Sequence, residues 1–167
     1  MNQLEPADLH HLNAAAGWLG LNCPADARAE LDGLGPRLQK HPAVLETRWL
    51  ICAHEKDWSA ALEIARTELA AAPEDCSGWL HQAYALRRMP GCGLRQAKEA
   101  LLPAIQKFPD EPVVAYNLAC YACQLGDLTG AREWLAKSVE SGGKKQIKGM
   151  ALADEDLKPL WQEIESW

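Results

Sequence analysis

Cysteine and histidine are the residues of this sequence best suited to metal or redox chemistry, and Cys120 and Cys123 form its most closely spaced cysteine pair. Three residues apart on a helix, both thiols would lie on one side. A zinc site needs four ligands, and the sequence places no second cysteine pair or histidine pair nearby. A thioredoxin-like pair would lie at a helix N-terminus after a strand, whereas this pair lies within an expected helix. We therefore expect packing residues here, with no metal and no cofactor.

The other candidate groups give equally little support for catalysis. His10 and His11 are adjacent, so on a helix they point about 100° apart and cannot chelate one ion together. Cys92 lies in the expected Pro90–Gly93 loop, where an exposed thiol could react; only Arg95 is available to activate it. The sequence contains no phosphate-binding loop and no nucleophile–base motif. We expect a protein that is not an enzyme, and the reactivity of Cys92 stays open.

Charge and composition exclude several classes of partner. The net charge of −6 and the pI near 5.4 argue against a nucleic-acid surface, which needs clustered Lys and Arg. No window approaches the roughly 18 apolar residues of a membrane helix. The first residues, MNQLEPADLHHL, have no basic region followed by an apolar run, so no secretory signal is expected. Six cysteines without a disulfide pattern then favour a reducing, cytoplasmic setting.

The element that would hold the cysteine pair is a helical hairpin spanning Pro112 to Val139. Asp110 is a candidate N-cap, Pro112 suits a first helical turn, and Gly126 suits the end of the first helix, before Asp127 caps the second. Apolar residues recur at spacings of three and four, the period of a helix. They are Val113, Tyr116, Leu118, Ala119, Ala122 and Leu125 in the first helix, and Leu128, Ala131, Leu135 and Val139 in the second.

The same hairpin pattern recurs along the chain. The small residues of the second helices, Ala27, Ala61, Ala97 and Ala131, are separated by 34, 36 and 34 residues. The matching positions of the first helices, Ala15, Trp49, Ala83 and Ala119, are separated by 34, 34 and 36. The two extra residues belong to a lengthened turn at Met89–Gly93. The sequence therefore predicts four units, at 8–41, 42–75, 76–111 and 112–145.

Proline and glycine predict where the units depart from regularity. Gly33, Gly35 and Pro36 should break the first unit near Leu34, since an interior proline costs about 3 kcal/mol. Pro103 should kink the second helix of the third unit. The stretch SGGKKQIKGM is expected to be mobile. A last helix, 155–166, then follows, with Pro159 in its first turn and Asp154 or Asp156 as its cap, and it should cover the open end of the last unit.

The fourth unit resembles the tetratricopeptide repeat, a helix–turn–helix unit of about 34 residues. The resemblance rests on Tyr116, Leu118, Ala119, the Gly126-Asp127 turn, Ala131 and Ser138, and Trp79 matches the signature aromatic position of the third unit. The family's closing proline is absent, and Gly142 and Gly143 stand there instead. The resemblance implies an all-α fold: one α-solenoid domain, 1–167, of about four repeats with a C-terminal capping helix.

In that family the first helices line a concave groove that holds a peptide or a partner's helix. Carried over by register, the partner-binding residues would be Leu50, Leu80, Tyr84, Arg87, Tyr116, Cys120 and Gln124, with Leu12, Ala16, Glu46 and Ala53 beside them. This lining is mainly apolar, which suits a helix or an extended hydrophobic peptide. It lacks the Lys and Asn clamp of relatives that bind acidic chaperone tails. Simple packing between repeats is the alternative for Leu80 and Tyr84.

Two classes of function stay open at this point. The first is a non-catalytic interaction module, an adaptor or small chaperone, that binds a peptide or helix of a protein partner in the groove. The second is a structural or self-associating subunit, a homodimer for instance, whose groove is filled by its own C-terminal helix or by another copy. Neither class involves nucleic acid or membrane, and the sequence does not identify the partner.

Overall fold

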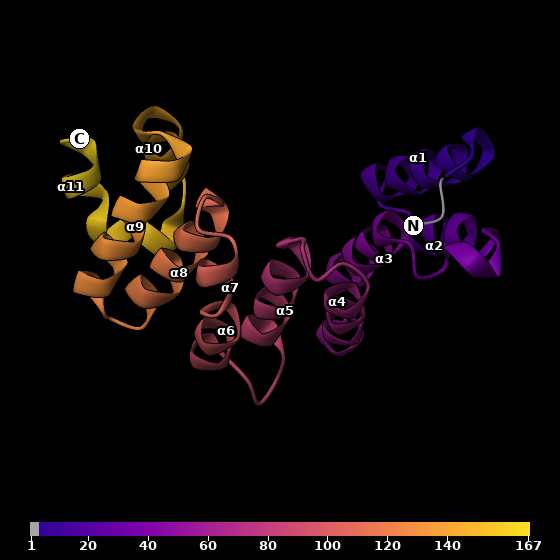
Figure 1. Cartoon of the computed structure of the whole chain (residues 1–167), viewed down its shortest axis with the longest axis horizontal. Helices are drawn as coiled ribbons and strands as arrows, with labels where there is room; N and C mark the ends of the chain where they lie inside the picture. Colours follow the sequence, from indigo (N-terminus) through magenta and orange to yellow (C-terminus); the bar gives the residue numbers. More distant parts are fainter. Residues whose placement is uncertain (1–3) are drawn as a thin grey trace. The chain divides into compact units, whose positions relative to one another are not determined.

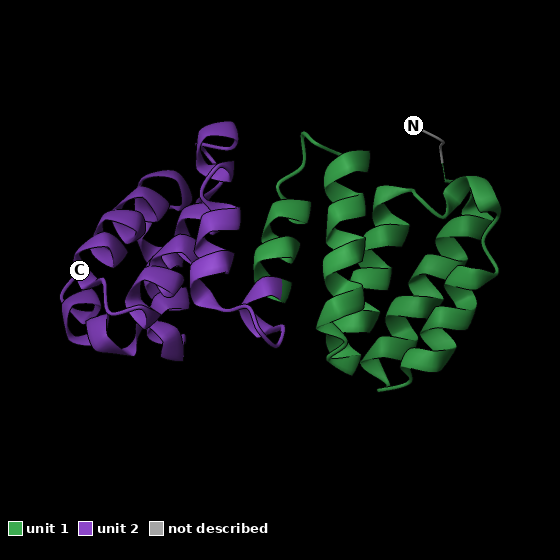
Figure 2. Cartoon of the chain, turned by 90° about the horizontal axis from the view of Figure 1, so that it is seen from below, with its two compact units in different colours: residues 1–85 green, residues 86–167 purple. Residues whose placement is uncertain are grey.

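The computed structural model describes residues 4–167, and within them the chain is all-helical, with no β-strand (Figure 1). The chain divides into two compact units, one running up to Ala85 and the other from Leu86 to Trp167 (Figure 2). The boundary falls inside helix α5 (Ser77–Arg88), and so within the third unit of the repeat pattern. Each compact unit has buried residues of its own.

The first compact unit, unit 1, is built from consecutive helices that pack on their neighbours. They are α1 (Pro6–Gly20), α2 (Pro24–Asp32), the 3₁₀ helix η1 (Pro36–Leu38), α3 (Pro42–Glu55), α4 (Trp58–Ala71) and the first part of α5. Helix α1 packs on α2, α3 packs on α4, and α3 also contacts α1 and α2. Its core includes Ala15, Ala27, Leu31, Leu34, Leu38, Val44 and Ile51. The predicted break near Leu34 is confirmed, because α2 ends at Asp32 and η1 follows.

Helices α4 and α5 approach closely at a glycine. A Cβ atom built on Gly78 would lie 2.9 Å from the backbone nitrogen of Leu69, closer than real side chains come. Any larger residue at this position would push the two helices apart, so glycine permits the contact. The approach brings the side chains of α5 against those of α3 and α4, where the aromatic residues of unit 1 gather.

The second compact unit, unit 2, is organised around one hairpin. Its elements are the last residues of α5, α6 (Leu94–Leu101), α7 (Ala104–Lys107), α8 (Pro112–Gln124), α9 (Leu128–Gly142), α10 (Lys144–Leu152), the 3₁₀ helix η2 (Glu155–Leu160) and α11 (Trp161–Glu165). Helix α8 packs along α9 and also contacts α6, α7 and η2. Residues 114–116 and 118–123 of α8 are all buried, so this helix is enclosed on nearly every side.

Two expectations in unit 2 are corrected by the structure. Pro103 does not kink one helix but separates two, because α6 ends at Leu101 and α7 begins at Ala104. Proline has no N–H to continue the hydrogen-bond ladder, and no long helix follows that could hold the two parts together. The N-cap of α8 is Glu111, one residue after the predicted Asp110.

The C-terminal region differs most from expectation. The stretch predicted to be mobile forms α10 instead, and Ile147 and Ala151 of this helix are buried. Gly143, with φ of 80°, ends α9 and lets the new helix begin directly. The single helix expected over 155–166 is two elements, η2 and α11, with Pro159 inside the 3₁₀ part. A proline there cannot donate the α-helical bond to Glu155, which favours the tighter 3₁₀ turn.

Across residues 4–167, none of the helices is both long enough and apolar enough to pass through a membrane.

Candidate binding surfaces

Hairpins α3–α4 and α8–α9 have the same local design. Each first helix begins at a proline, Pro42 or Pro112, and an aspartate fifteen residues later caps the second helix. The Asp57 side chain accepts a hydrogen bond from the Ala60 backbone N–H at 3.0 Å, and Asp127 accepts one from Gly130 at 2.9 Å. Counted from the prolines, residues of the two hairpins therefore correspond one to one.

Positions four, eight and twelve residues after the proline lie on one face of each first helix, because they are one helical turn apart. In α3 these are Glu46, Leu50 and His54, which we call the α3 face; in α8 they are Tyr116, Cys120 and Gln124, which we call the α8 face. Four of the seven residues predicted to bind a partner lie on these faces, and the other three, Leu80, Tyr84 and Arg87, lie on α5. The surroundings of the two faces differ sharply.

The α8 face is covered by residues 154–160, which we call the C-terminal segment. The Tyr116 hydroxyl donates a hydrogen bond to Asp154 Oδ2 at 3.0 Å, and the Gln124 amide donates one to the Asp156 backbone carbonyl at 2.9 Å. Arg87 pairs with the Asp156 carboxylate through both of its terminal nitrogens, and Nη2 lies 2.7 Å from Oδ1. The guanidinium of Arg87 therefore fixes the segment at the edge of this face.

Cys120 and Asp154 lie at the centre of the covered face. The thiol donates to Asp154 Oδ2 at 3.5 Å, and the other oxygen of Asp154 accepts the backbone N–H of Asp156 at 3.0 Å. Burial raises the pKa of the Cys120 thiol well above its usual range, and the negative charge of Asp154 raises it further. The pKa of Tyr116 is raised for the same two kinds of reason. Both side chains are therefore neutral donors at physiological pH.

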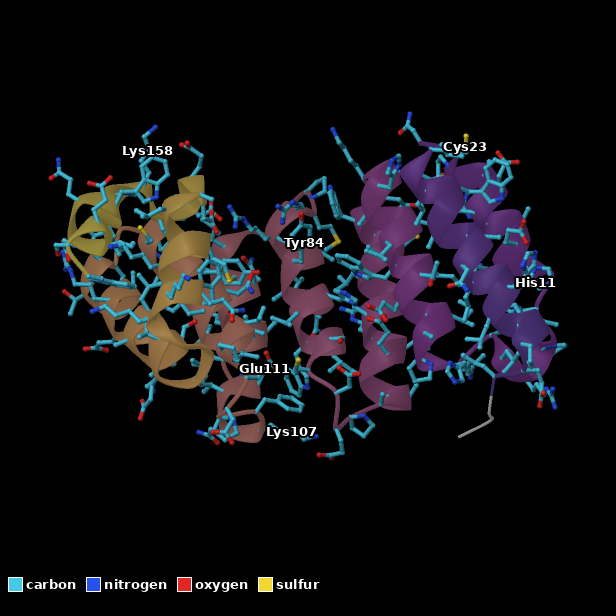
Figure 3. The ribbon with its side chains drawn as sticks, turned by 90° about the horizontal axis from the view of Figure 1, so that it is seen from above. His11, Cys23, Tyr84, Lys107, Glu111 and Lys158 are labelled. Carbon is cyan, nitrogen blue, oxygen red and sulfur yellow. The ribbon has the colours of Figure 1, made fainter. Side chains whose placement is uncertain are left out.

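Apolar contacts complete the attachment of the C-terminal segment. Leu157 and Leu160 are fully buried, and Ile164 of α11 is buried behind them. The indole N–H of Trp161 donates to the Ala151 carbonyl at 2.9 Å, which ties α11 to α10. Lys158, in contrast, points into solvent (Figure 3). The segment thus presents acidic side chains and leucines to α8 and its remaining polar side chains outward.

The α3 face is open. Leu50 is 45% exposed, and it lines a hollow of about 320 Å³ together with Ala16, Leu19, Thr47 and His54, from α1 and α3. Glu46 is exposed, and within the described part of the chain no ion pair or hydrogen bond engages its carboxylate. The face therefore offers an exposed leucine at a mainly apolar hollow, and the unneutralised carboxylate of Glu46 lies one helical turn away.

An aromatic cluster flanks the α3 face. The Trp49 ring stacks on His81 with 3.9 Å between centroids, and Tyr84 meets Trp49 edge-on at 5.6 Å. Glu68, almost fully buried, lies 2.7 Å from Nδ1 of His81 and holds that ring in place. Tyr84, labelled on α5 in Figure 3, is 37% exposed and also contacts Trp58. The cluster gives the open face a rigid aromatic border.

The seven predicted partner-binding residues thus separate into two groups. Tyr116, Cys120, Gln124 and Arg87 contact the chain's own C-terminal segment, whereas Leu50 and Tyr84 are exposed and Leu80 is partly buried. Sequence reasoning missed Asp154 and Asp156 as partners of the first group. It recognised them only as helix caps, and Asp154 does cap η2.

Possible metal ligands come together at one place among the described residues. Sulfur of Cys120 and carboxylate oxygens of Asp154 and Asp156 lie within 4.8 Å of one another. Arg87 already neutralises Asp156 there, and Tyr116 and Cys120 already donate to Asp154. A cation would have to displace the Arg87 guanidinium. The geometry therefore fits hydrogen bonds and an ion pair that attach the C-terminal segment better than it fits a metal centre.

The remaining reactive groups are dispersed. Cys120 and Cys123 are both buried, and burial raises the pKa of the Cys123 thiol as well. The rings of His10 and His11 lie edge-on with centroids 6.1 Å apart, and His11 is engaged by Glu30 at 2.7 Å. Cys92 is half-buried in its loop. These positions form no arrangement of a nucleophile, a base and a site for a reacting atom.

A second hollow, of about 400 Å³, lies on the far side of the hairpin in unit 2, over α9 and α11. It is lined by Leu135, Ala136, Val139, Leu160, Ile164 and Trp167, with Arg132, Lys144 and Glu163 around them. Arg132 and Glu163 pair bidentately across it, with contacts of 2.7 and 2.5 Å. Arg132 and Glu163 therefore neutralise each other at the hollow.

Comparisons of the chain with protein-family models and with curated proteins found no match to either.

Proposed function

We propose that the protein is a non-catalytic interaction module whose open α3 face binds a peptide or helix of a protein partner. The observation that supports this most directly is the exposure of Leu50 at a mainly apolar hollow. The corresponding face of α8 is covered by the C-terminal segment, so a helix face of this kind can bind a segment of polypeptide. An adaptor or a small chaperone would both use the α3 face in this way.

The finer architecture belongs to the same proposal. We propose that the helical hairpins are tetratricopeptide-like repeats arranged as an α-solenoid. The spacing of 34 to 36 residues between the small residues supports this, as do the matching proline starts and aspartate caps. Close approach of the two helices in each hairpin needs small residues, and Ala61 and Ala131 are fully buried at equivalent places in α4 and α9.

A role without catalysis is supported by what the titratable groups already do. Arg87, Asp154 and Asp156 engage one another or backbone groups at the α8 face, which is the behaviour of a structural lock. The buried thiols have raised pKa values and are poor nucleophiles. We further propose a reducing cytoplasmic setting, because the six cysteines are free thiols.

A second candidate is a self-associating subunit, and the C-terminal segment supports it. This segment covers the α8 face within one chain, and exchange of the same segment between two chains would preserve each of its contacts. Light scattering at increasing protein concentration tests this. A dimer that forms with concentration and dissociates in the Asp156→Ala variant would favour the subunit over the adaptor.

The interaction module is tested by affinity capture from a native lysate with three baits: the wild type, Leu50→Ser and Leu102→Ser. Leu102 is 43% exposed, much like Leu50, but lies in unit 2 between α6 and α7. We expect at least one protein to be captured by the wild type and Leu102→Ser and lost with Leu50→Ser. Circular dichroism verifies that each bait is folded. Equal capture by all three baits would contradict a role for the α3 face.

A further inference from the structure

We infer that the partner segment bound by the α3 face is basic and amphipathic, with leucine-like residues for the hollow and Lys or Arg opposite Glu46. This rests on the proposed function of that face. The chain itself contains an example of a bound segment, because its own C-terminal segment covers the corresponding face of α8. The comparison of donors and acceptors on the two faces then gives the sign of the partner's charge.

The α8 face is a surface of hydrogen-bond donors. The Tyr116 hydroxyl, the Cys120 thiol and the Gln124 amide all donate toward the C-terminal segment, and the Arg87 cation lies beside them. The segment supplies what these groups need: two aspartates, a free backbone carbonyl, and then Leu157 and Leu160 for the apolar contact. An acidic segment that carries leucines thus complements a surface of hydrogen-bond donors.

The α3 face carries the opposite pattern. Where the α8 face has the Tyr116 donor, the α3 face has the Glu46 carboxylate, which can only accept. Where the α8 face has Cys120, the α3 face has the apolar Leu50. The position equivalent to Arg87, counted from Ala83 and Ala15, is Leu19 of α1, which lines the hollow. Within residues 4–167, no Lys or Arg of the α3 face takes the place of Arg87, so a matching segment must donate to Glu46 and bring its own positive charge.

The charge of the whole chain has the same asymmetry. Residues up to Ala85 contain six Lys or Arg and twelve Asp or Glu, a net charge of −6; residues from Leu86 onward contain eleven of each, a net charge of zero. The net negative charge of the protein therefore comes from unit 1. Such a field attracts a basic segment and speeds its encounter with the α3 face, an effect that weakens as salt rises.

The same pattern argues against a second copy of this chain as the occupant of the α3 face. The C-terminal segment would place Asp154, Glu155 and Asp156 against Glu46 in a unit that already carries a net charge of −6. Like charges brought together disfavour the complex. Exchange of that segment between copies would use the α8 face, and the α3 face is left for a chain of opposite charge.

Two synthetic peptides test the inference directly. One has the native sequence of residues 153–166, ADEDLKPLWQEIES. The other has lysine in place of its five acids, and both keep the same leucines, tryptophan and isoleucine. Binding of each labelled peptide to the full-length protein is measured by fluorescence anisotropy at low and at physiological salt. We expect the lysine peptide to bind at least tenfold more tightly than the native one, with an affinity that falls as salt rises.

Variants of the protein separate recognition by the face from general attraction to an acidic unit. Glu46→Lys and Asp26→Lys change the charge of unit 1 equally, but Asp26 is an exposed residue of α2 that lies outside the α3 face. We expect Glu46→Lys to weaken the lysine peptide at least tenfold and Asp26→Lys less than threefold. Leu50→Ser should also weaken it, which locates the peptide on the face. Circular dichroism verifies that all three variants fold.

Each other outcome overturns the inference in a recognisable way. Equal weakening by Glu46→Lys and Asp26→Lys would mean that the peptide responds only to net charge. If the acidic native peptide bound more tightly than the lysine peptide, and Leu50→Ser abolished that binding, the α3 face would be a binding surface for an acidic segment. The inferred basic charge of the partner would then be wrong. Failure of both peptides to bind would overturn the basic segment while the lysate capture, which assumes nothing about charge, still decides the proposed function.

Discussion

Hairpins α3–α4 and α8–α9 share their proline starts, their aspartate caps and their buried alanines, yet one first helix is open and the other is enclosed. The difference arises outside the hairpins. A segment about forty residues along the chain from α8 returns to its face and attaches through Asp154 and Asp156. No segment among residues 4–167 provides α3 with such a cover on the face of Leu50. Local signals therefore build the hairpin, whereas its cover depends on contacts with residues distant in the sequence, such as Arg87 with Asp156.

The largest expected effect tests what the two hairpins have in common. Ala61 and Ala131 are fully buried at the contact between the helices of their hairpins. Substitution of either by Asp would bury an unpaired charge, and we expect each variant to lose more than about 3 kcal/mol of unfolding free energy. Urea unfolding followed by circular dichroism measures this. Ala136→Asp, on the exposed side of α9, is the control and should change stability by less than about 0.5 kcal/mol. A small loss for Ala131→Asp would mean that the repeat register is misplaced.

The second prediction breaks the cover of the α8 face. Arg87 and Asp156 are each about one-quarter exposed and pair through two contacts. Removal of the arginine leaves a half-buried carboxylate without its cation, so Arg87→Ala should destabilise the protein by about 2 kcal/mol. Arg66→Ala is the matched control, because the Arg66–Glu63 pair is exposed and should contribute less than about 0.5 kcal/mol.

Hydrogen exchange gives a local measure of the same change. In Arg87→Ala, amides of η2 and α11 should exchange faster relative to those of α4, whereas in Arg66→Ala they should not. Uniform acceleration across both compact units would instead show that the arginine supports the fold as a whole and does not specifically attach the C-terminal segment.

The sequence predicted helix boundaries better than it predicted contacts between residues far apart in the chain. Helix starts, caps and breaks depend on a few neighbouring residues, so the start at Pro112, the cap at Asp127 and the break near Leu34 could be predicted. Helix α10 could not, because Gly142, Gly143 and Gly149 indicate a break in the chain, and so short a helix depends on the burial of Ile147 and Ala151. The same limit applies to the site. Periodicity placed Tyr116, Cys120 and Gln124 on one face, but no periodic signal could pair them with Asp154 and Asp156.

The third prediction uses alkaline pH to test the buried donors of the covered face. Burial and the nearby aspartate raise the pKa of Cys120 in the folded protein above that of an unfolded thiol, about 8.5. Above that pH the unfolded chain releases a proton that the folded chain retains, so stability is full below it and falls as pH rises. Tyr116, also raised, adds to the fall at higher pH, above about 10.

We therefore expect the unfolding free energy to decrease from pH 8 to pH 10.5, by at most about 1.4 kcal/mol per pH unit for each group. The Cys120→Ala/Tyr116→Phe variant should lose less stability over this range, because both titrating groups are gone. Cys52 of unit 1, whose pKa burial also raises, remains in the variant and accounts for part of the residual slope. Parallel slopes for the variant and the wild type would mean that the α8 face does not hold these protons.

The smallest expected effect concerns the turns that join the helices of the two hairpins. The residue fourteen positions after the proline is left-handed in both, with φ of 60° at Lys56 and 82° at Gly126. Glycine adopts this conformation without strain, whereas lysine has a Cβ that disfavours it. Lys56→Gly should therefore stabilise the protein by up to about 1 kcal/mol, and Gly126→Lys should destabilise it by a similar amount. Urea unfolding of the two single variants and their combination measures both effects. Because nothing lies within 4 Å of a Cβ at Gly126, the cost there is one of backbone conformation alone. If the hairpins are equivalent, the two changes should nearly cancel in the double variant; a large remainder would show that the turns, like the faces, have diverged.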